Sequence, residues 1–119
     1  MDRLKKRADF LRAQKGVRRV TPSLTLEACS GPVQAEPQTL RVGFTATKKL
    51  GNAVTRNRAK RRLRAAAAQV LPGIGSAGCD YVLVARPGTL ERSFAQLTGD
   101  LASAVRAAHL KLDLKGEPS

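Results

Sequence analysis

The sequence is poor in the residues from which enzymes usually build an active site. Its 119 residues include one histidine, two cysteines, one tyrosine, three phenylalanines and no tryptophan. His109 has no second metal ligand or nucleophile near it in the sequence, and the nine acidic residues show no paired spacing typical of metal-dependent hydrolysis. We therefore expect neither a catalytic residue nor a protein-bound metal in this chain.

Cysteine pairs and long apolar runs are also missing. Cys29 and Cys79 lack CxxC spacing, so buried thiols are favoured, with a disulfide as the alternative if their strands adjoin. No apolar run approaches the roughly 18 residues of a membrane span. The basic N-terminus is not followed by the apolar stretch of a secretory signal. We expect a cytoplasmic protein that does not enter a membrane.

Positive charge is abundant and concentrated. The formal net charge is +13, and residues 41–64 hold nine cations and no acid, while residues 1–19 hold eight cations and two acids. Residues 65–119 hold five charges of each sign. Such localised charge favours a polyanionic partner, nucleic acid first and an anionic membrane surface second.

The strongest signal is the run "TRNRAKRRLR" at residues 55–64, inside a predicted helix over 52–71 that Pro72 and Gly73 end. One face of this helix carries Ala59, Leu63, Ala66 and Val70. The cations cover the remaining surface. A solvated charged face is the ordinary alternative, but the run has no acid for i,i+4 pairs, and like charges one turn apart are destabilising. Nucleic-acid binding is therefore favoured, and the absence of zinc ligands, heptads and a helix-turn-helix pair argues against a DNA-reading factor.

The remaining patterns predict an α+β fold, an α/β sandwich in which a small central sheet of three to four strands packs with helices. The order is helix, strand, strand, helix, strand, helix, in one domain over residues 1–119 with frayed ends at 1–3 and 113–119. We expect helices over 4–15 and 87–110 and strands over 23–29, 40–47 and 79–85, with a further short strand near Val33. The first two strands are expected to form an antiparallel pair, and the core to be aliphatic and alanine-rich.

Face assignments follow from the same periodicities. The residues expected in the core are Leu4, Ala8 and Leu11 of the first helix, Leu40, Val42 and Phe44 of the second strand, and Leu90, Phe94, Leu97, Leu101 and Val105 of the last helix. In the second strand, Arg41, Gly43 and Thr45 would then face the opposite, accessible side of the sheet.

The segment "GFTATKKLGNAVTRNRAKRRLR", residues 43–64, resembles the RNR-motif segment of the bacterial ribonuclease P protein subunit family. "LKKRADFLRAQKG" resembles the family's opening helix and "DYVLVARPG" its last strand, so the resemblance covers roughly residues 4–110 in matching order. It implies an α/β sandwich with a left-handed βαβ crossover, against the usual right-handed rule. It also implies a ribonucleoprotein endoribonuclease in which a catalytic RNA, using magnesium (Mg2+) held mainly by that RNA, removes the 5′ leader of precursor tRNA.

The resemblance also implies site residues. Those expected to contact the catalytic RNA are Lys48, Lys49, Arg56, Asn57, Arg58, Lys60, Arg61, Arg62 and Arg64. Those expected to line a cleft for the single-stranded leader are Phe10, Arg12, Glu27, Arg41 and Thr45. Phe10 would stack on an unpaired base, or else belong to the core.

Two positions depart from the family pattern. Many members have a second aromatic residue where Gln14 stands and an aromatic in the first strand where Glu27 stands. With fewer rings, the cleft is expected to depend more on charge and hydrogen bonds. The alternative function is a structural or ribosomal-type RNA-binding protein without a role in tRNA processing, which would explain the charge but not the ordered motif.

Overall fold

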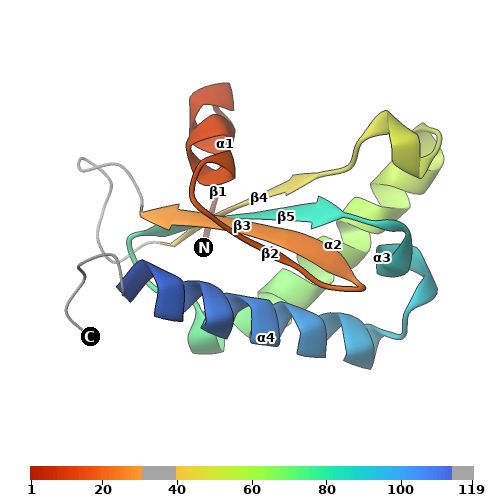
Figure 1. The fold of residues 1–119 in the computed structure, drawn as a ribbon. Helices are drawn as coiled ribbons and strands as arrows, with labels where there is room; N and C mark the ends of the chain where they lie inside the picture. The colour runs from red at the N-terminus through yellow and green to blue at the C-terminus, as the bar shows by residue number, and fades with distance from the viewer. Residues whose placement is uncertain (31–39, 114–119) are drawn as a thin grey trace.

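The computed structural model describes residues 1–30 and 40–113, which form one mixed five-stranded sheet with helices on both faces (Figure 1). The strands are β1 (Asp2–Arg3), β2 (Val17–Val20), β3 (Leu24–Ser30), β4 (Arg41–Thr45) and β5 (Cys79–Ala85). The helices are α1 (Arg7–Gln14), the 3-10 turn η1 (Lys48–Leu50), α2 (Ala53–Ile74), α3 (Pro87–Glu91) and α4 (Phe94–Asp113). Helix α1 lies on one face of the sheet, and α2 and α4 lie on the other. The predicted α+β class is confirmed.

The strand order is β1-β4-β5-β3-β2, so β5 lies between β4 and β3. It pairs in parallel with β4 and antiparallel with β3. The expectation that β3 and β4 form an antiparallel pair is therefore wrong. The physical reason lies in β5, whose residues are apolar towards both faces: Tyr81 and Leu83 join the larger core, and Val82 joins the smaller one under α1. A strand that is apolar on both faces belongs at the centre of a sheet.

The sheet has two strands that were not predicted. Asp2 and Arg3 pair with Arg41 and Val42, so residues 2–3 belong to the sheet and the expected frayed start is corrected. Residues Val17–Val20 form an edge strand against β3. The expected strand near Val33 falls outside the described residues. Of the tail expected to be frayed, 113–119, only Asp113 is described, and it ends α4.

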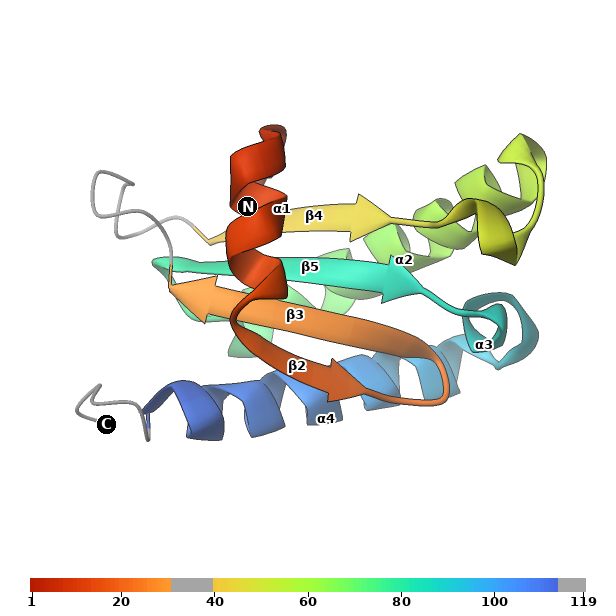
Figure 2. The same cartoon turned by 45° about the horizontal axis from the view of Figure 1, so that its top comes forward.

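The connection from β4 through α2 to β5 has the unusual hand. In Figure 2 the sheet is seen from the α1 side, with β4 and β5 running left to right, β5 below β4, and α2 behind them. The chain therefore passes behind the sheet on its way to the lower strand, and this makes the crossover left-handed. The expectation drawn from the family resemblance is confirmed.

Helix α2 has the predicted buried face. Ala59, Leu63 and Ala66 are fully buried, and Val70 packs against the core while half-buried. The Asn52 side chain caps the helix by accepting a hydrogen bond from the Thr55 backbone N–H at 2.9 Å. The predicted stop at Pro72 is wrong, because Pro72 lies inside the last turn and the helix ends at Ile74. Buried alanines of α2 and α4 fill the space between these helices, as expected for an alanine-rich core.

The predicted closing helix is two helices. Ser93 separates α3 from α4 and forms a reciprocal cap with Gln96, whose backbone N–H donates to Ser93 Oγ at 3.1 Å. Leu97, Leu101 and Val105 are buried as expected. Phe94 is 38% exposed, so its assignment to the core is wrong, because it begins α4 at the surface.

Helix α1 buries a different face from the one predicted. Ala8 and Leu11 are exposed, Leu4 is buried but precedes the helix, and the buried residues of α1 are Asp9 and Ala13. Hydrophobic periodicity missed this face because it assigns an acid to the solvent side, whereas Asp9 is buried with charged partners. On the sheet beneath, Cys29 faces α1 and Cys79 packs on the opposite face, so no disulfide joins them.

Candidate nucleic-acid interface

The cations of α2 and η1 form an exposed surface without compensating acids. Exposed members are Lys48, Lys49, Asn57, Arg58, Arg61 and Arg64, and half-buried members are Arg56, Lys60 and Arg62. None of the ion pairs among residues 1–30 and 40–113 involves any of them. The structure thus brings together the residues expected to contact RNA. Their charge remains available for phosphate groups, which bind arginine in two-point geometry.

Arg62 differs from its neighbours because its guanidinium is used within the fold. Nη2 donates a hydrogen bond to the Arg92 carbonyl oxygen at 2.8 Å, and Nη1 lies 3.4 Å from the Leu90 carbonyl oxygen. These carbonyls belong to the junction between α3 and α4. Arg62 therefore ties α2 to that junction, and the sequence pattern alone did not separate it from the exposed cations.

A second group of cations gathers at the β1 edge of the sheet. The Arg3 guanidinium carbon lies 5.7 Å from the centre of the Phe44 ring, and that of Arg64 lies 5.9 Å from the same centre. Both are within cation–π range. Arg3 was not among the predicted RNA contacts, and it extends the basic surface of α2 across the edge strand.

Arg12 and Arg41 lie in a buried ion network beside the predicted cleft. Asp80, 1% exposed, accepts from Arg41 at 2.7 Å and 2.8 Å and from Arg12 at 2.9 Å. Asp9 accepts from Arg12 at 2.8 Å and pairs with Arg41 at 3.1 Å. Burial raises the pKa of Asp9, but the hydrogen bonds from the two arginines outweigh it and bring the pKa below its ordinary value.

A groove of about 300 Å³ opens on the α1 face of the sheet. Three of the five predicted cleft residues line it: Phe10, Glu27 and Thr45. Arg12 and Arg41 do not, because their guanidinium groups bind Asp9 and Asp80. The lining residues that were not predicted are Gln14, Arg18, Thr47, Val82 and Val84. Arg18 was missed because the strand that carries it was missed, although Gln14 had been recognised as a departure from the family pattern.

Phe10 is half-buried and belongs to both the core and the groove. It packs against the smaller core cluster and also lines the groove. Its ring lies over Gly43, where a Cβ atom would come within 2.6 Å of Cε1. Glycine at this strand position therefore lets the ring lie close to the sheet. Phe10 therefore belongs to the smaller core and to the groove at once, and its stacking on an unpaired base stays a prediction.

Glu27 is the acid in the groove. It is 8% exposed, and burial raises the pKa of its carboxyl above the ordinary value, while the charge of Arg18 opposes that rise. Its side chain makes no hydrogen bond or ion pair with the residues that the structure describes. The groove therefore holds a carboxylate whose acceptor capacity is unused.

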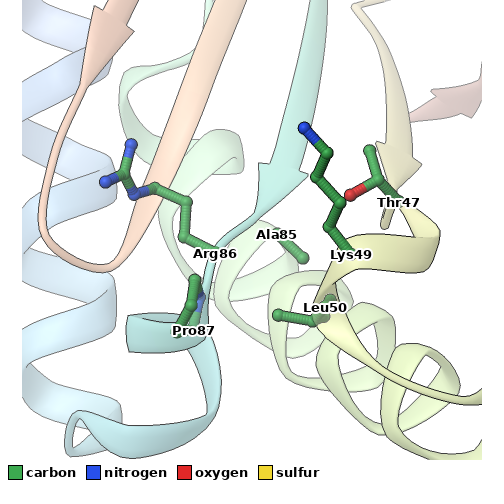
Figure 3. A pocket seen from close by; sticks show the side chains of 6 residues that line it. All are labelled: Thr47, Lys49, Leu50, Ala85, Arg86 and Pro87. Carbon is green, nitrogen blue, oxygen red and sulfur yellow. The ribbon is translucent and has the colours of Figure 1, made fainter.

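A smaller hollow of about 180 Å³ (Figure 3) shares one lining residue, Thr47, with the groove. Lys49 and Arg86 rise on opposite sides of it, and its floor is apolar, with Leu50, Ala85 and Pro87. Arg86 follows β5 directly and was not predicted. Two cations above an apolar floor suit a nucleotide, because its phosphate is anionic and its base is a flat ring that packs on apolar side chains.

Within residues 1–30 and 40–113 no group of three or more histidine, cysteine or acidic side chains is arranged to hold a metal ion. Asp9 and Asp80 lie close to the groove, but arginine occupies both.

Within residues 1–30 and 40–113, no helix has the length and apolar character needed to cross a membrane.

Comparison with known proteins gives consistent matches. The family model described as Ribonuclease P matches residues 1–109. The chain is 51% identical over 108 residues to the ribonuclease P protein component of Paramagnetospirillum magneticum, covering 89% of this chain and 81% of that protein. Identity to the corresponding protein of Ruegeria pomeroyi is 50% over 107 residues, covering 89% and 85%. The solved RNase P protein of Staphylococcus aureus superposes with a TM-score of 0.72 at 28% identity, covering 91% of this chain and 95% of that one.

Proposed function

The chain belongs to the ribonuclease P protein family, the protein part of a ribonucleoprotein endoribonuclease, and we propose that it holds the catalytic RNA with α2 and η1 while its groove receives the 5′ leader of precursor tRNA. The RNA contacts on α2 are the exposed cations and Asn57. The leader contacts are the residues that line the groove, with Phe10 stacking on an unpaired base.

One observation carries this proposal: the groove and the unpaired cations meet at the end of β4. Thr45 and Thr47 line the groove, and Lys48 and Lys49 follow at once in η1. A single strand that leaves the groove at Thr47 enters the hollow between Lys49 and Arg86. The shared residue Thr47 supports a path for an RNA strand from the groove to the hollow, and α2 supplies a separate basic helix for a folded RNA.

The chemistry belongs to the RNA. Among the described residues, Ser23 pairs with Asp100 and Tyr81 with His109, but both hydroxyl-bearing residues are fully buried. Asp9 and Asp80 are held by arginines. We propose that magnesium ions bound by the RNA supply the metal for hydrolysis of the leader phosphodiester. The protein raises substrate affinity by binding the leader and neutralises phosphate repulsion between the two RNAs. Because precursor tRNA is the proposed substrate, the proposed location of the protein is the cytoplasm.

Reconstitution tests the proposal. The protein, the ribonuclease P RNA of the same source and a precursor tRNA are combined at low magnesium, and cleavage at the mature 5′ end is measured. The expected result is no cleavage by the protein alone and stimulation of cleavage by the RNA. Cleavage by the protein without RNA, or no stimulation at any magnesium concentration, would overturn it.

The ribosomal-type alternative gains no support from the comparisons, since the relatives found are ribonuclease P protein components. Purification from cells separates the two functions. A single structured RNA that cleaves precursor tRNA supports the proposed function, whereas co-purification with ribosomal subunits supports the alternative.

A further inference from the structure

Among the buried acids that the structure describes on the α1 face of the sheet, only Glu27 is not bound by an arginine. Asp9 and Asp80 are buried to a similar degree, and each binds both Arg12 and Arg41. Glu27 is 8% exposed, and its side chain has neither a hydrogen bond nor an ion pair within residues 1–30 and 40–113. Arg18 stands opposite Glu27 in the strand register and lowers the cost of its charge without a direct ion pair.

The surroundings of Glu27 indicate where its carboxylate is used. It lies in the middle of β3 and lines the groove together with the Phe10 ring, the valines of β5 and the polar ends of Gln14 and Thr45. The Glu27 oxygens are not among the fully buried side-chain atoms that lack a partner, so they are open to the groove, where a ligand that supplies N–H groups can bind them. Because Glu27 repels phosphate, the donors of an RNA strand that can meet it are base N–H groups and the ribose 2′-hydroxyl. A base that stacks on Phe10 in the same groove brings its edge, with its N–H groups, towards Glu27.

The four bases differ in what they present to a carboxylate. Guanine offers N1–H and the N2 amino group side by side, which match the two carboxylate oxygens. Adenine and cytosine offer one amino group next to a ring acceptor. Uracil offers N3–H between two carbonyl oxygens, both of which repel a carboxylate. A stacked base held against Phe10 with its edge towards Glu27 is therefore bound best when it is guanine and worst when it is uracil.

We infer that Glu27 selects the base of the leader nucleotide that occupies the groove, favouring guanine and rejecting uracil. The inference rests on the proposed function, because it needs the leader to enter the groove. It goes beyond that function by giving the site a base preference, and it assigns the preference to one residue.

The experiment uses the holoenzyme, formed from this protein and its catalytic RNA. Precursor tRNAs carry a constant leader in which each position in turn is guanosine or uridine, and the dissociation constant is measured for each. At one position, guanosine is expected to bind about tenfold more tightly than uridine, the size of one good base-edge contact. In Glu27→Gln that ratio is expected to fall close to one, because an amide pairs with either base.

Glu91→Gln is the matched control. Glu91 lies exposed at the end of α3 and outside the groove, and its replacement removes the same charge. It is expected to strengthen binding of all leaders equally and to leave the guanosine-to-uridine ratio unchanged. Thermal denaturation of Glu27→Gln checks that the variant is folded. A ratio near one at every position with the wild-type protein, or a ratio that Glu27→Gln leaves unchanged, would overturn the inference.

A leaderless precursor tRNA distinguishes a failure of the proposed leader contact from a failure of the base preference alone. If the wild-type holoenzyme binds substrates with and without a leader equally well, the proposed leader contact itself fails. If the leader strengthens binding but its bases do not matter, the proposed function stands and the role of Glu27 is refuted.

Discussion

Arg41 and Asp80 stand opposite each other on the parallel strands β4 and β5 and form a two-point ion pair, with Nε 2.8 Å from Oδ1 and Nη2 2.7 Å from Oδ2. Asp80 also binds Arg12 of α1, so one carboxylate joins two strands and a helix. Because α1 carries Phe10, the network fixes the helix that forms one wall of the groove. Its charges stabilise the site without entering it.

Replacing Asp80 is expected to destabilise the fold. Asp80→Asn keeps the shape of the side chain but leaves Arg12 and Arg41 without their main acceptor. The two arginines are partly exposed and keep Asp9 as a partner, so the expected loss is that of charged hydrogen bonds, about 2–3 kcal/mol. Urea denaturation measures the change in the free energy of unfolding. Asp100→Asn is the control, because Asp100 binds Ser23 and Arg92 at a more exposed site, where the loss should be about 1 kcal/mol. Equal losses in the two variants would contradict the central role of Asp80.

Glu27→Gln is expected to stabilise the free protein at neutral pH. Burial raises the pKa of Glu27 in the folded state, so its contribution to stability is full below the unfolded value, near 4.5, and is lost as pH rises through the folded value. Glutamine does not titrate, so the gain in the free energy of unfolding should be largest near neutral pH and shrink in acid. Urea denaturation at neutral pH and at acid pH measures this gain in the free energy of unfolding. If the gain grows as pH falls, the pKa of Glu27 is not raised in the folded state and this prediction is refuted.

Asp9→Asn is expected to show the opposite pH dependence. The pKa of Asp9 is lowered in the folded state, so its contribution is present above the unfolded value, near 3.8, and is lost as pH falls through the folded value. The variant should therefore be less stable than the wild type at neutral pH and approach it in acid. Following both variants over the same pH series makes each the control for the other.

Local patterns identified α2 and β5 from the sequence because those signals are complete within one segment. Ala59 and Leu63 recur at helical spacing, and β5 is apolar throughout. Strand order is not local: β3 and β4 are adjacent in sequence, yet β5 lies between them. The edge strand Val17–Val20 escaped because it is short and half of it is arginine.

The positions of the candidate site residues were predicted best where exposure alone decides them and worst where a distant partner decides them. The exposed cations of α2 lie where the helical wheel puts them. Arg12 and Arg41 were assigned to the cleft, but Asp80, far away in sequence, binds both. Arg62 was grouped with the exposed arginines, but carbonyls of the α3–α4 junction hold it. Only the tertiary fold reveals these partners.

Gly43→Ala is expected to weaken leader binding through Phe10. The new Cβ would lie 2.6 Å from Cε1 and 2.7 Å from Cζ of Phe10, so the ring must move away from the sheet. We expect a loss of leader-dependent affinity of about tenfold, the scale of one base–aromatic stack, with binding of a leaderless substrate unchanged. Phe10→Ala should cause a similar loss, and the double variant little more than either alone.

Gly99→Ala is the control for that substitution. Gly99 lies in α4, and a Cβ there meets no other atom within 4 Å. Alanine should stabilise the helix by about 1 kcal/mol and leave leader binding unchanged. If Gly43→Ala binds leaders as the wild type does, the close packing of Phe10 on Gly43 does not set the shape of the groove.

Arg58 and Arg62 are expected to separate RNA binding from stability, although they lie one turn apart on α2. Arg58 is exposed, so Arg58→Ala should keep the wild-type free energy of unfolding and lower the slope of log affinity against log salt by about one unit, one phosphate contact. Arg62→Ala removes charged hydrogen bonds to the Arg92 and Leu90 carbonyls and should destabilise the fold by about 2 kcal/mol.

Salt titrations of RNA binding and urea denaturation are measured on both variants, with the titrations at a temperature where each is fully folded. We expect Arg58→Ala to change only the salt slope and Arg62→Ala to change mainly the free energy of unfolding, because the Arg62 guanidinium is occupied within the fold while that of Arg58 is open to solvent. The contrary result is that Arg62→Ala lowers the salt slope as much as Arg58→Ala and leaves the free energy of unfolding unchanged. In that case the contact between Arg62 and the α3–α4 junction breaks when RNA binds, and Arg62 is one of the phosphate-binding cations.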